Sequence, residues 1–98
     1  MNYFAVLYRY APDSELIATV RPRHREFLGS LKEEGKLVGS GPYTDGDGGA
    51  LIVLRLPEPA GVEDAASLMN NDPFLKEGAL DGREIRAWNP VLNIFDGQ

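Results

Sequence analysis

Four apolar stretches along the chain have the composition of β-strands. They contain most of the aromatic and β-branched side chains, and residues that favour turns, chiefly Gly, Pro and Asp, lie between them. The predicted strands are residues 2–10, 36–43, 50–56 and 83–95. Pro90 lies inside the last stretch and cannot donate to a sheet ladder, so we expect that strand to be interrupted or to lie at an edge.

Helices are expected between the first and second strands. A short helical turn comes first, with Asp13 or Ser14 as its cap. Pro22 disfavours helical geometry at Arg21, the residue before it. We therefore expect a new helix that begins with Pro22 in its first turn and ends at Gly35, a residue that readily adopts the left-handed conformation.

Two further helices are expected after the third strand. The first covers residues 62–70, and the second covers residues 71–78. Asp72 is the expected cap of the second helix. Pro73 lies in its first turn, where a missing N–H does no harm, and Gly78 marks its end.

The element order βαββαβ predicts an α+β protein with the ferredoxin-like fold, a four-stranded antiparallel sheet with helices on one face. The strands are apolar on both faces, because in residues 2–10 the alternating sets that begin at Tyr3 and at Phe4 are both largely apolar. Helices can cover only one of these faces. We therefore expect a homodimer joined through the sheet, with coverage of the second face by strand ends and loops as the alternative.

Composition narrows the class of protein. The chain has 98 residues, enough for one domain, which we expect to span residues 1–98. Its net charge of −5 lacks the basic footprint of a DNA- or RNA-binding protein, so no nucleic-acid partner is expected. The absence of cysteine excludes disulfides and fits a cytoplasmic location. The apolar start is too short to span a membrane and lacks the basic region of a signal peptide, so no membrane association is expected.

His24 is the only histidine of the chain. It precedes Phe27, Leu28 and Leu31 by three, four and seven positions, which places it on the buried face of the expected helix. In the first turn of that helix, the helix dipole and burial both favour the neutral imidazole, which can accept a proton as a general base. The alternative is a packing histidine that is hydrogen-bonded to a carbonyl group or to a partner subunit.

Asp72 has a structural role as a helix cap, worth about 1 kcal/mol. It becomes a candidate functional residue only if the fold brings it next to His24, which is possible because both helices cover the same face of the sheet. A carboxylate at that place would orient the imidazole and fix its tautomer. It would also favour the charged ring and so raise the pKa of the imidazole, whereas the helix dipole and burial lower that pKa. The sequence leaves the direction of the net change in pKa open.

Three other residues are candidates for ligand binding. Gly41 and Pro42 end the second strand, where glycine permits close backbone approach to a ligand or a helix; a tight strand end with a bulge is the alternative. Arg21 can hold an anionic group, or it can be a solvated surface arginine. One histidine without cysteine leaves only carboxylates as further metal ligands, and the glycines lack the pattern of a phosphate loop, so neither a metal nor a cofactor is expected.

Four segments together resemble the YCII-related (YciI-like) family of small bacterial proteins. They are RPRH at 21–24, EGKLVGSGP at 34–42, GALIVL at 49–54 and NDPFLKEG at 71–78, and they follow the family order over essentially the whole chain. The family is similar in fold to the dimeric α/β barrels, in which two ferredoxin-like subunits join through their sheets. The resemblance therefore implies the same homodimer independently of the strand pattern.

The resemblance also implies a site. The family's proposed active site pairs a histidine with an aspartate in a pocket, and these roles pass to His24 and Asp72. Gly41 and Pro42 match the Gly-Pro of the family. An activity assigned within the family is the dehydrochlorination of a chlorinated, hydroxylated aromatic compound. We do not transfer that substrate to this chain. The loop at residues 44–49 is shorter than the corresponding insertion in some members, so the specificity that depends on this loop is open.

These observations lead us to expect a cofactor-independent enzyme that acts on a small phenolic or carbonyl-bearing metabolite. His24, oriented by Asp72, would transfer protons in an enolisation, an isomerisation or an elimination. No nucleophile with an evident activating base stands out, so covalent catalysis is not favoured. The alternative is a non-catalytic module that binds a small molecule, or assists a partner enzyme, through the same pocket.

Overall fold

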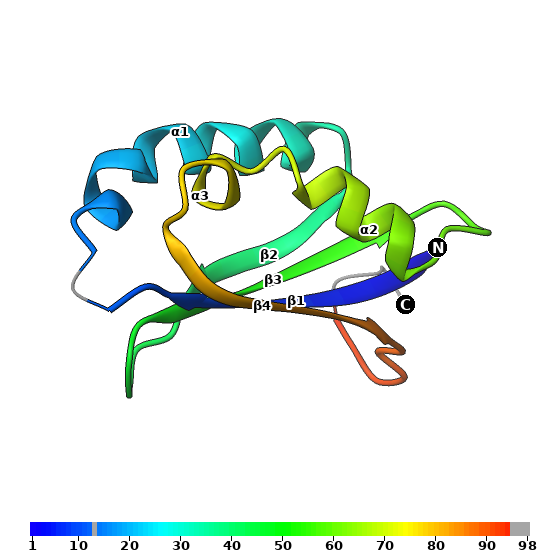
Figure 1. Cartoon of the computed structure of the whole chain (residues 1–98). Coiled ribbons are helices and arrows are strands. Elements are labelled where there is room, and N and C mark those ends of the chain that lie inside the picture. The colour runs from blue at the N-terminus through cyan, green and yellow to red at the C-terminus, as the bar shows by residue number, and fades with distance from the viewer. Residues whose placement is uncertain (13, 95–98) are drawn as a thin grey trace.

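Four antiparallel strands form one sheet, and the helices lie on one of its faces (Figure 1). The computed structural model describes residues 1–12 and 14–94. The elements are β1 (Asn2–Tyr10), α1 (Leu16–Glu33), β2 (Leu37–Pro42), β3 (Gly49–Leu56), α2 (Val62–Met69), α3 (Pro73–Lys76) and β4 (Leu80–Trp88). The sheet order is β2-β3-β1-β4. The predicted α+β, ferredoxin-like architecture is confirmed.

The core lies between the helices and the inner face of the sheet. In the central strand β1, Phe4, Val6 and Tyr8 alternate with outward residues and are between 0% and 2% exposed. The neighbouring strand β3 contributes Ile52 and Leu54, which are fully buried. Because each fully buried side chain of this size is worth about 2 kcal/mol, this apolar row holds the helices against the sheet.

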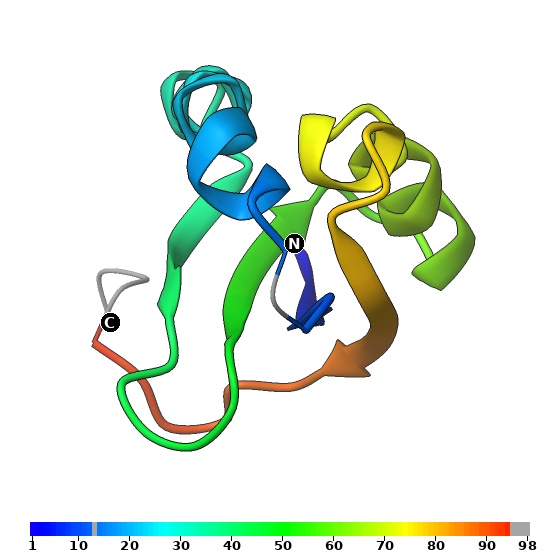
Figure 2. The same ribbon diagram turned by 60° about the vertical axis from the view of Figure 1, so that its left-hand side comes forward.

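The outer face of the sheet carries a second apolar set. The register of β1 and β3 places Leu7 opposite Leu51 and Ala5 opposite Val53. Leu51 is 39% exposed, and Trp88 in β4 is 43% exposed. All helices of the described residues lie on the other side of the sheet, so none of them covers this face (Figures 1 and 2).

One continuous helix replaces the two helical segments predicted around Arg21. Helix α1 runs from Leu16 to Glu33 with Pro22 inside it, so the prediction that a helix begins at Pro22 is wrong. Val20 is 1% exposed and lies four residues before His24, so the buried face of the helix continues across the proline. The burial of this face outweighs the local cost of proline.

The ends of α1 follow the predicted signals in part. The N-cap is Glu15, whose side chain makes no capping hydrogen bond, so neither predicted cap is confirmed. The hydroxyl oxygen of Ser14 nevertheless accepts a hydrogen bond from the N–H of Leu16, the first helical residue, at 3.1 Å. Asp13, the other predicted cap, lies outside the described residues. Gly35 follows the helix with a φ of 76°, in the left-handed region, as predicted.

Strand β4 differs from the prediction at both ends. It spans Leu80–Trp88 rather than residues 83–95. It begins earlier because Leu80 pairs with Tyr10 beyond an irregularity in the β1 ladder, and it ends before Pro90, which cannot continue the ladder. It lies at an edge of the sheet, as predicted, while Phe95 lies outside the described residues.

We expect Pro22→Ala to raise the free energy of unfolding by about 1–2 kcal/mol in urea denaturation. Pro22 has no N–H for the carbonyl group of Ala18, one turn earlier in α1, and alanine supplies it. The restriction that proline places on the unfolded chain offsets part of the gain. The exposed Glu26→Ala is the control and changes stability by less than about 0.5 kcal/mol. A less stable Pro22→Ala variant would contradict this account of α1.

Candidate active site

His24 lies on the face of α1 that packs against the sheet. It belongs to the buried stripe of the helix and is 6% exposed, so the predicted placement on the buried face is confirmed. The predicted placement in the first helical turn is wrong, because α1 begins at Leu16 and His24 lies more than two turns further on. The helix dipole acts mainly within the first turn, so it has little influence on this ring.

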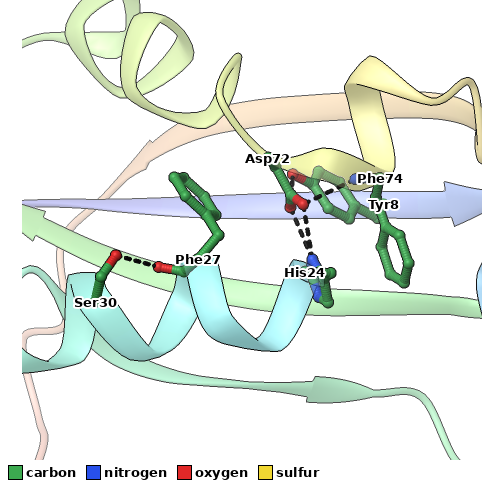
Figure 3. A network of polar contacts seen from close by, with 6 residues as sticks. All are labelled: Tyr8, His24, Phe27, Ser30, Asp72 and Phe74. Carbon is green, nitrogen blue, oxygen red and sulfur yellow. Dashed lines mark hydrogen bonds and ion pairs between the residues drawn. The ribbon is translucent and has the colours of Figure 1, made fainter. Parts of the chain in front are cut away.

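The carboxylate of Asp72 is fully buried and is contacted by groups from three elements. As predicted, Asp72 caps α3: its Oδ1 accepts a hydrogen bond from the N–H of Phe74 at 3.0 Å. Its Oδ2 accepts a hydrogen bond from the hydroxyl group of Tyr8 in β1 at 2.7 Å. Nδ1 of His24 in α1 lies 2.8 Å from Oδ1 and 2.9 Å from Oδ2 (Figure 3). These partners compensate the desolvation of the buried charge.

The contact with Asp72 sets the tautomer of the imidazole. An ionised carboxylate can only accept hydrogen bonds, so Nδ1 of His24 carries the hydrogen and donates it. In the neutral ring, Nε2 keeps its lone pair and is the atom that can take up a proton. The carboxylate then stabilises the imidazolium that forms. The arrangement is that of a proton-accepting histidine with an orienting aspartate.

Tyr8 acts as a hydrogen-bond donor to the aspartate. The pKa of its hydroxyl group is raised well above the ordinary value of 10.0, first by burial and then by the negative charge of Asp72 and the hydrogen bond to it. The charge of Arg83, the cross-strand neighbour of Tyr8 in β4, opposes this rise in pKa. Tyr8 therefore keeps its proton over the physiological pH range and holds Asp72 in place.

Phe74 fixes the plane of the imidazole. Its ring stacks on His24 with the centroids 3.9 Å apart and the planes inclined by 11°. Phe74 is fully buried, and its own N–H is the backbone donor to Asp72. The first turn of α3 thus supplies both the carboxylate cap and the surface on which the imidazole lies (Figure 3).

A cavity of about 130 Å³ lies between α1 and the strands β2 and β3. Its floor includes the apolar side chains of Ala50 and Ile52. The side chains at the end of β2 are short, so they leave space between the strand and the helix. The polar and strand-end residues that line the cavity are Tyr10, Arg21, His24, Arg25, Ser40, Gly41 and Pro42.

The cavity gathers most of the residues predicted from the sequence. Arg21, His24, Gly41 and Pro42 all line it. Asp72 does not line it but contacts the imidazole through Nδ1. One side of the histidine ring is therefore held by the protein, and the other ring nitrogen is the one available to a molecule in the cavity.

Gly41 lines the cavity, but its surroundings do not require a glycine. A Cβ on Gly41 would meet no atom within 4 Å, so no close neighbour in the described structure requires a glycine there. The bulge considered as the alternative is present, but it lies earlier in β2, between Leu37 and Gly39. Gly41 lines the cavity with its backbone, because the register pairs it with Leu51, whose side chain is on the outer face of the sheet.

Several residues of the site were not predicted, among them the aromatic residues Tyr8, Tyr10 and Phe74. Tyr8 has the sequence pattern of any inward aromatic residue of a strand, so nothing distinguished it from the core. Ser40 gave no signal either. Arg25 did have a sequence signal, because it lies four residues after Arg21 and shares the same side of a continuous helix. The helix break expected at Pro22 concealed that relation.

Larger surface hollows occur elsewhere in the described structure. One of about 690 Å³ lies beside α2 and is lined in part by Lys36, Leu56 and Leu68. It contains no histidine and no pair of titratable groups in contact with each other. The smaller cavity is the candidate active site because a buried histidine lines it and contacts a fully buried aspartate.

Residues 1–12 and 14–94 contain neither a metal-binding cluster nor a helix that could span a membrane. No three His, Cys, Asp or Glu side chains in this part of the chain are grouped so as to hold a metal ion. No helix in it is long and apolar enough to cross a membrane. The cytoplasmic location and the lack of nucleic-acid partners stay predictions from composition.

The fold is similar to that of several solved proteins. With 5-chloro-2-hydroxyhydroquinone dehydrochlorinase (TftG) from Burkholderia phenoliruptrix AC1100, in complex with 2,5-dihydroxybenzoquinone, the TM-score is 0.75 at 22% identity, over 89% of this chain and 93% of that chain. With an antibiotic biosynthesis monooxygenase the TM-score is 0.59 at 15% identity, over 91% of this chain and 97% of that chain. With protein Atu4242 from Agrobacterium tumefaciens the TM-score is 0.57 at 17% identity, over 92% of this chain and 93% of that chain. At these identities the likeness concerns the fold.

Sequence comparison identifies the family. The uncharacterized protein YjpA from Bacillus subtilis (strain 168) is 34% identical over 65 residues, which are 66% of this chain and 71% of that protein. The YCII-related domain matches residues 1–89. This range includes every element from β1 to β4, and with them both His24 and Asp72. The resemblance seen in the sequence is confirmed: the chain belongs to the family of the YCII-related domain.

Proposed function

We propose that this protein is a cofactor-independent enzyme in which His24 transfers protons to and from a small metabolite. The substrate is a phenolic or carbonyl-bearing molecule with an acidic C–H or O–H. The reaction is an enolisation, an isomerisation or an elimination. The observation that carries the proposal is the contact of 2.8 Å between Nδ1 of His24 and the buried carboxylate of Asp72, beside a cavity that His24 lines.

The reaction begins when Nε2 of His24 takes a proton from the substrate. The electron pair of the broken bond stays on the substrate, and the ring becomes an imidazolium stabilised by Asp72. In an isomerisation, the imidazolium returns the proton to a different atom. In an elimination, the electron pair forms a double bond, the leaving group departs with its own electron pair, and the proton later passes to water.

The size and lining of the cavity support a small, partly apolar substrate. A volume of about 130 Å³ excludes large ligands. Leu28, Ala50 and Ile52 provide an apolar surface next to the histidine. The similarly folded TftG is a dehydrochlorinase whose structure holds 2,5-dihydroxybenzoquinone, a small oxygenated ring. Loss of HCl is an elimination, one of the reactions that a proton-accepting histidine assists.

A non-catalytic binding module is the second candidate function. The contacts of Asp72 with Tyr8, His24 and Phe74 hold the imidazole in a fixed tautomer. The same ring can therefore serve as a fixed hydrogen-bonding group for a captured metabolite. The enzyme and the module differ in whether His24 changes its protonation state while the ligand is bound.

We expect His24→Ala to lower kcat by about 10²–10⁴-fold, because the variant loses its general base. The substrate is to be found by screening phenolic and carbonyl compounds for thermal stabilisation of the protein, followed by a turnover assay. Asp72→Asn is expected to lower kcat similarly, since the amide does not stabilise an imidazolium. Asparagine is also a good helix cap, so the fold of α3 is retained.

The control for these variants is Glu26→Gln, an exposed substitution on the same helix, which should keep full turnover. Affinity for the ligand, measured by calorimetry, should change little in His24→Ala. Full turnover by His24→Ala would contradict the enzyme proposal. Binding without turnover by the wild-type protein, together with weaker binding by both site variants, would identify the module instead.

We expect the stability of the wild-type protein to fall steeply above the ordinary tyrosine pKa of 10.0, and the slope to be smaller in Tyr8→Phe. Because the pKa of Tyr8 is raised in the folded state, the unfolded chain loses that phenolic proton first. The contribution is complete below pH 10 and is lost above it at about 1.4 kcal/mol per pH unit. Urea denaturation between about pH 9 and pH 11 measures the slope. Equal slopes in the two proteins would show that Tyr8 is not held by Asp72 as described.

We propose further that two copies pair through the outer face of the sheet. A hollow of about 420 Å³ on this face is lined in part by Gly39, Gly41, Leu51 and Val53. A Cβ on either glycine would meet no atom within 4 Å, so the backbone of β2 is open to close approach from outside. Apolar surface of this kind, on the side without helices, is typical of an interface.

We expect the wild-type protein to have the mass of two chains in light scattering, and Leu51→Asp to weaken the dimer by about 100-fold or more, because it buries a charge. Val62→Asp is the matched control: Val62 is 38% exposed and Leu51 39%, but Val62 lies at the start of α2, on the helical side. A wild-type monomer at micromolar concentration would exclude this interface.

A further inference from the structure

Two arginines line the same cavity as His24. Arg21 and Arg25 are four residues apart in α1, so they project from the same side of the helix. Both line the cavity, and its opposite wall is formed by the end of β2. Arg23, between them in the sequence, does not line the cavity and instead pairs with Glu77 at 3.4 Å.

Neither cavity arginine is neutralised by a carboxylate of the described residues. Among the described residues, the arginines that form ion pairs with carboxylates are Arg9, Arg23 and Arg86. The chain as a whole has 15 acidic and 10 basic residues, so its net charge repels anions. Arg21 and Arg25 thus bring two positive charges, unpaired with any carboxylate of the described residues, to the lining of this cavity.

The charges of both arginines reach the interior of the site. Burial, and to a smaller extent the charge of Asp72, raise the pKa of the Tyr10 hydroxyl group, and the charges of Arg21 and Arg25 both oppose that rise. Tyr10 also lines the cavity, and its ring packs edge-on against Phe74, which stacks on His24. The arginine pair and the imidazole therefore act on the same small volume.

We propose that the ligand of this cavity is a compact organic anion whose charged oxygen atoms, from a carboxylate or an ionised phenol, bind to Arg21 and Arg25. In one respect this rests on the proposed function, because the acidic hydrogen of the same molecule faces Nε2 of His24. A planar guanidinium group matches an oxyanion in geometry and charge. The body of the ligand packs on the apolar side chains of Leu28 and Ile52.

The arginine pair also has a role in the chemistry. When His24 removes a proton, negative charge develops on the substrate. Fixed positive charges in a small cavity stabilise that charge more than water does. Arg21 and Arg25 thus provide both the affinity for an anion and part of the stabilisation of the enolate.

The single histidine of the chain allows a direct binding test that does not require catalysis. The Hε1 resonance of His24 is followed by NMR while sodium benzoate is added, and in parallel titrations with 4-nitrophenolate and with benzamide. Benzoate tests the carboxylate source of charge and 4-nitrophenolate the phenolate source. Benzamide is the neutral analogue of benzoate. We expect at least one of the anions to shift the resonance in a saturable way and benzamide to bind about tenfold more weakly or not at all.

The arginine variants locate the binding site. Arg21→Gln and Arg25→Gln should each weaken binding of the anion by about tenfold, and the corresponding lysine variants should recover part of it. Arg23→Gln, on the same helix but outside the cavity, is the matched control and should change the affinity by less than about twofold. Added sodium chloride should weaken binding of the anion to the wild-type protein.

Three results would overturn the anion site: no shift with either anion at tens of millimolar, equal affinity for benzoate and benzamide, or unchanged affinity in both glutamine variants. None of these depends on turnover. The proposed function fails separately, if His24→Ala retains full activity on the screened substrate. Saturable, arginine-dependent binding of an anion together with an active His24→Ala variant would leave the anion site standing and remove the proton-transfer role.

Discussion

The buried carboxylate of Asp72 is the constraint on which the site depends. A charge without solvent contact is stable only when its oxygens are hydrogen-bonded, and here the donors come from β1, α1 and the first turn of α3. Removing any one donor leaves part of that charge uncompensated. The requirement thus ties together three segments that are up to 64 residues apart in sequence.

One residue therefore serves both the fold and the site. As a helix cap, Asp72 uses one oxygen for the backbone of α3, and the same carboxylate orients His24. The stacking of Phe74 on the imidazole adds a second restraint from the same short helix. The imidazole is consequently held before any ligand arrives, which reduces the cost of reaching a productive geometry when a ligand binds.

Much of the fold followed from local composition and helical spacing. Runs of aromatic and β-branched residues between turn residues identified the strands, and the spacing of three, four and seven placed His24 on the buried face of its helix. The helix boundary at Pro22 was wrong because a local steric rule was applied without knowing that Val20 would be buried. That error also hid the relation between Arg21 and Arg25. The role of Tyr8 could not be predicted, since a strand pattern does not show which inward aromatic residue contacts a carboxylate 64 positions away.

The position of the cavity in the sheet has a consequence for how the family can diversify. One wall is β2, an edge strand that is hydrogen-bonded only to β3, whereas the histidine and its partners are anchored to α1, α3 and the central strand β1. Substitutions at Ser40 or Pro42 reshape the wall without disturbing the buried carboxylate. The shape of the cavity can thus change at the periphery of the sheet, while the contacts that hold His24 stay intact.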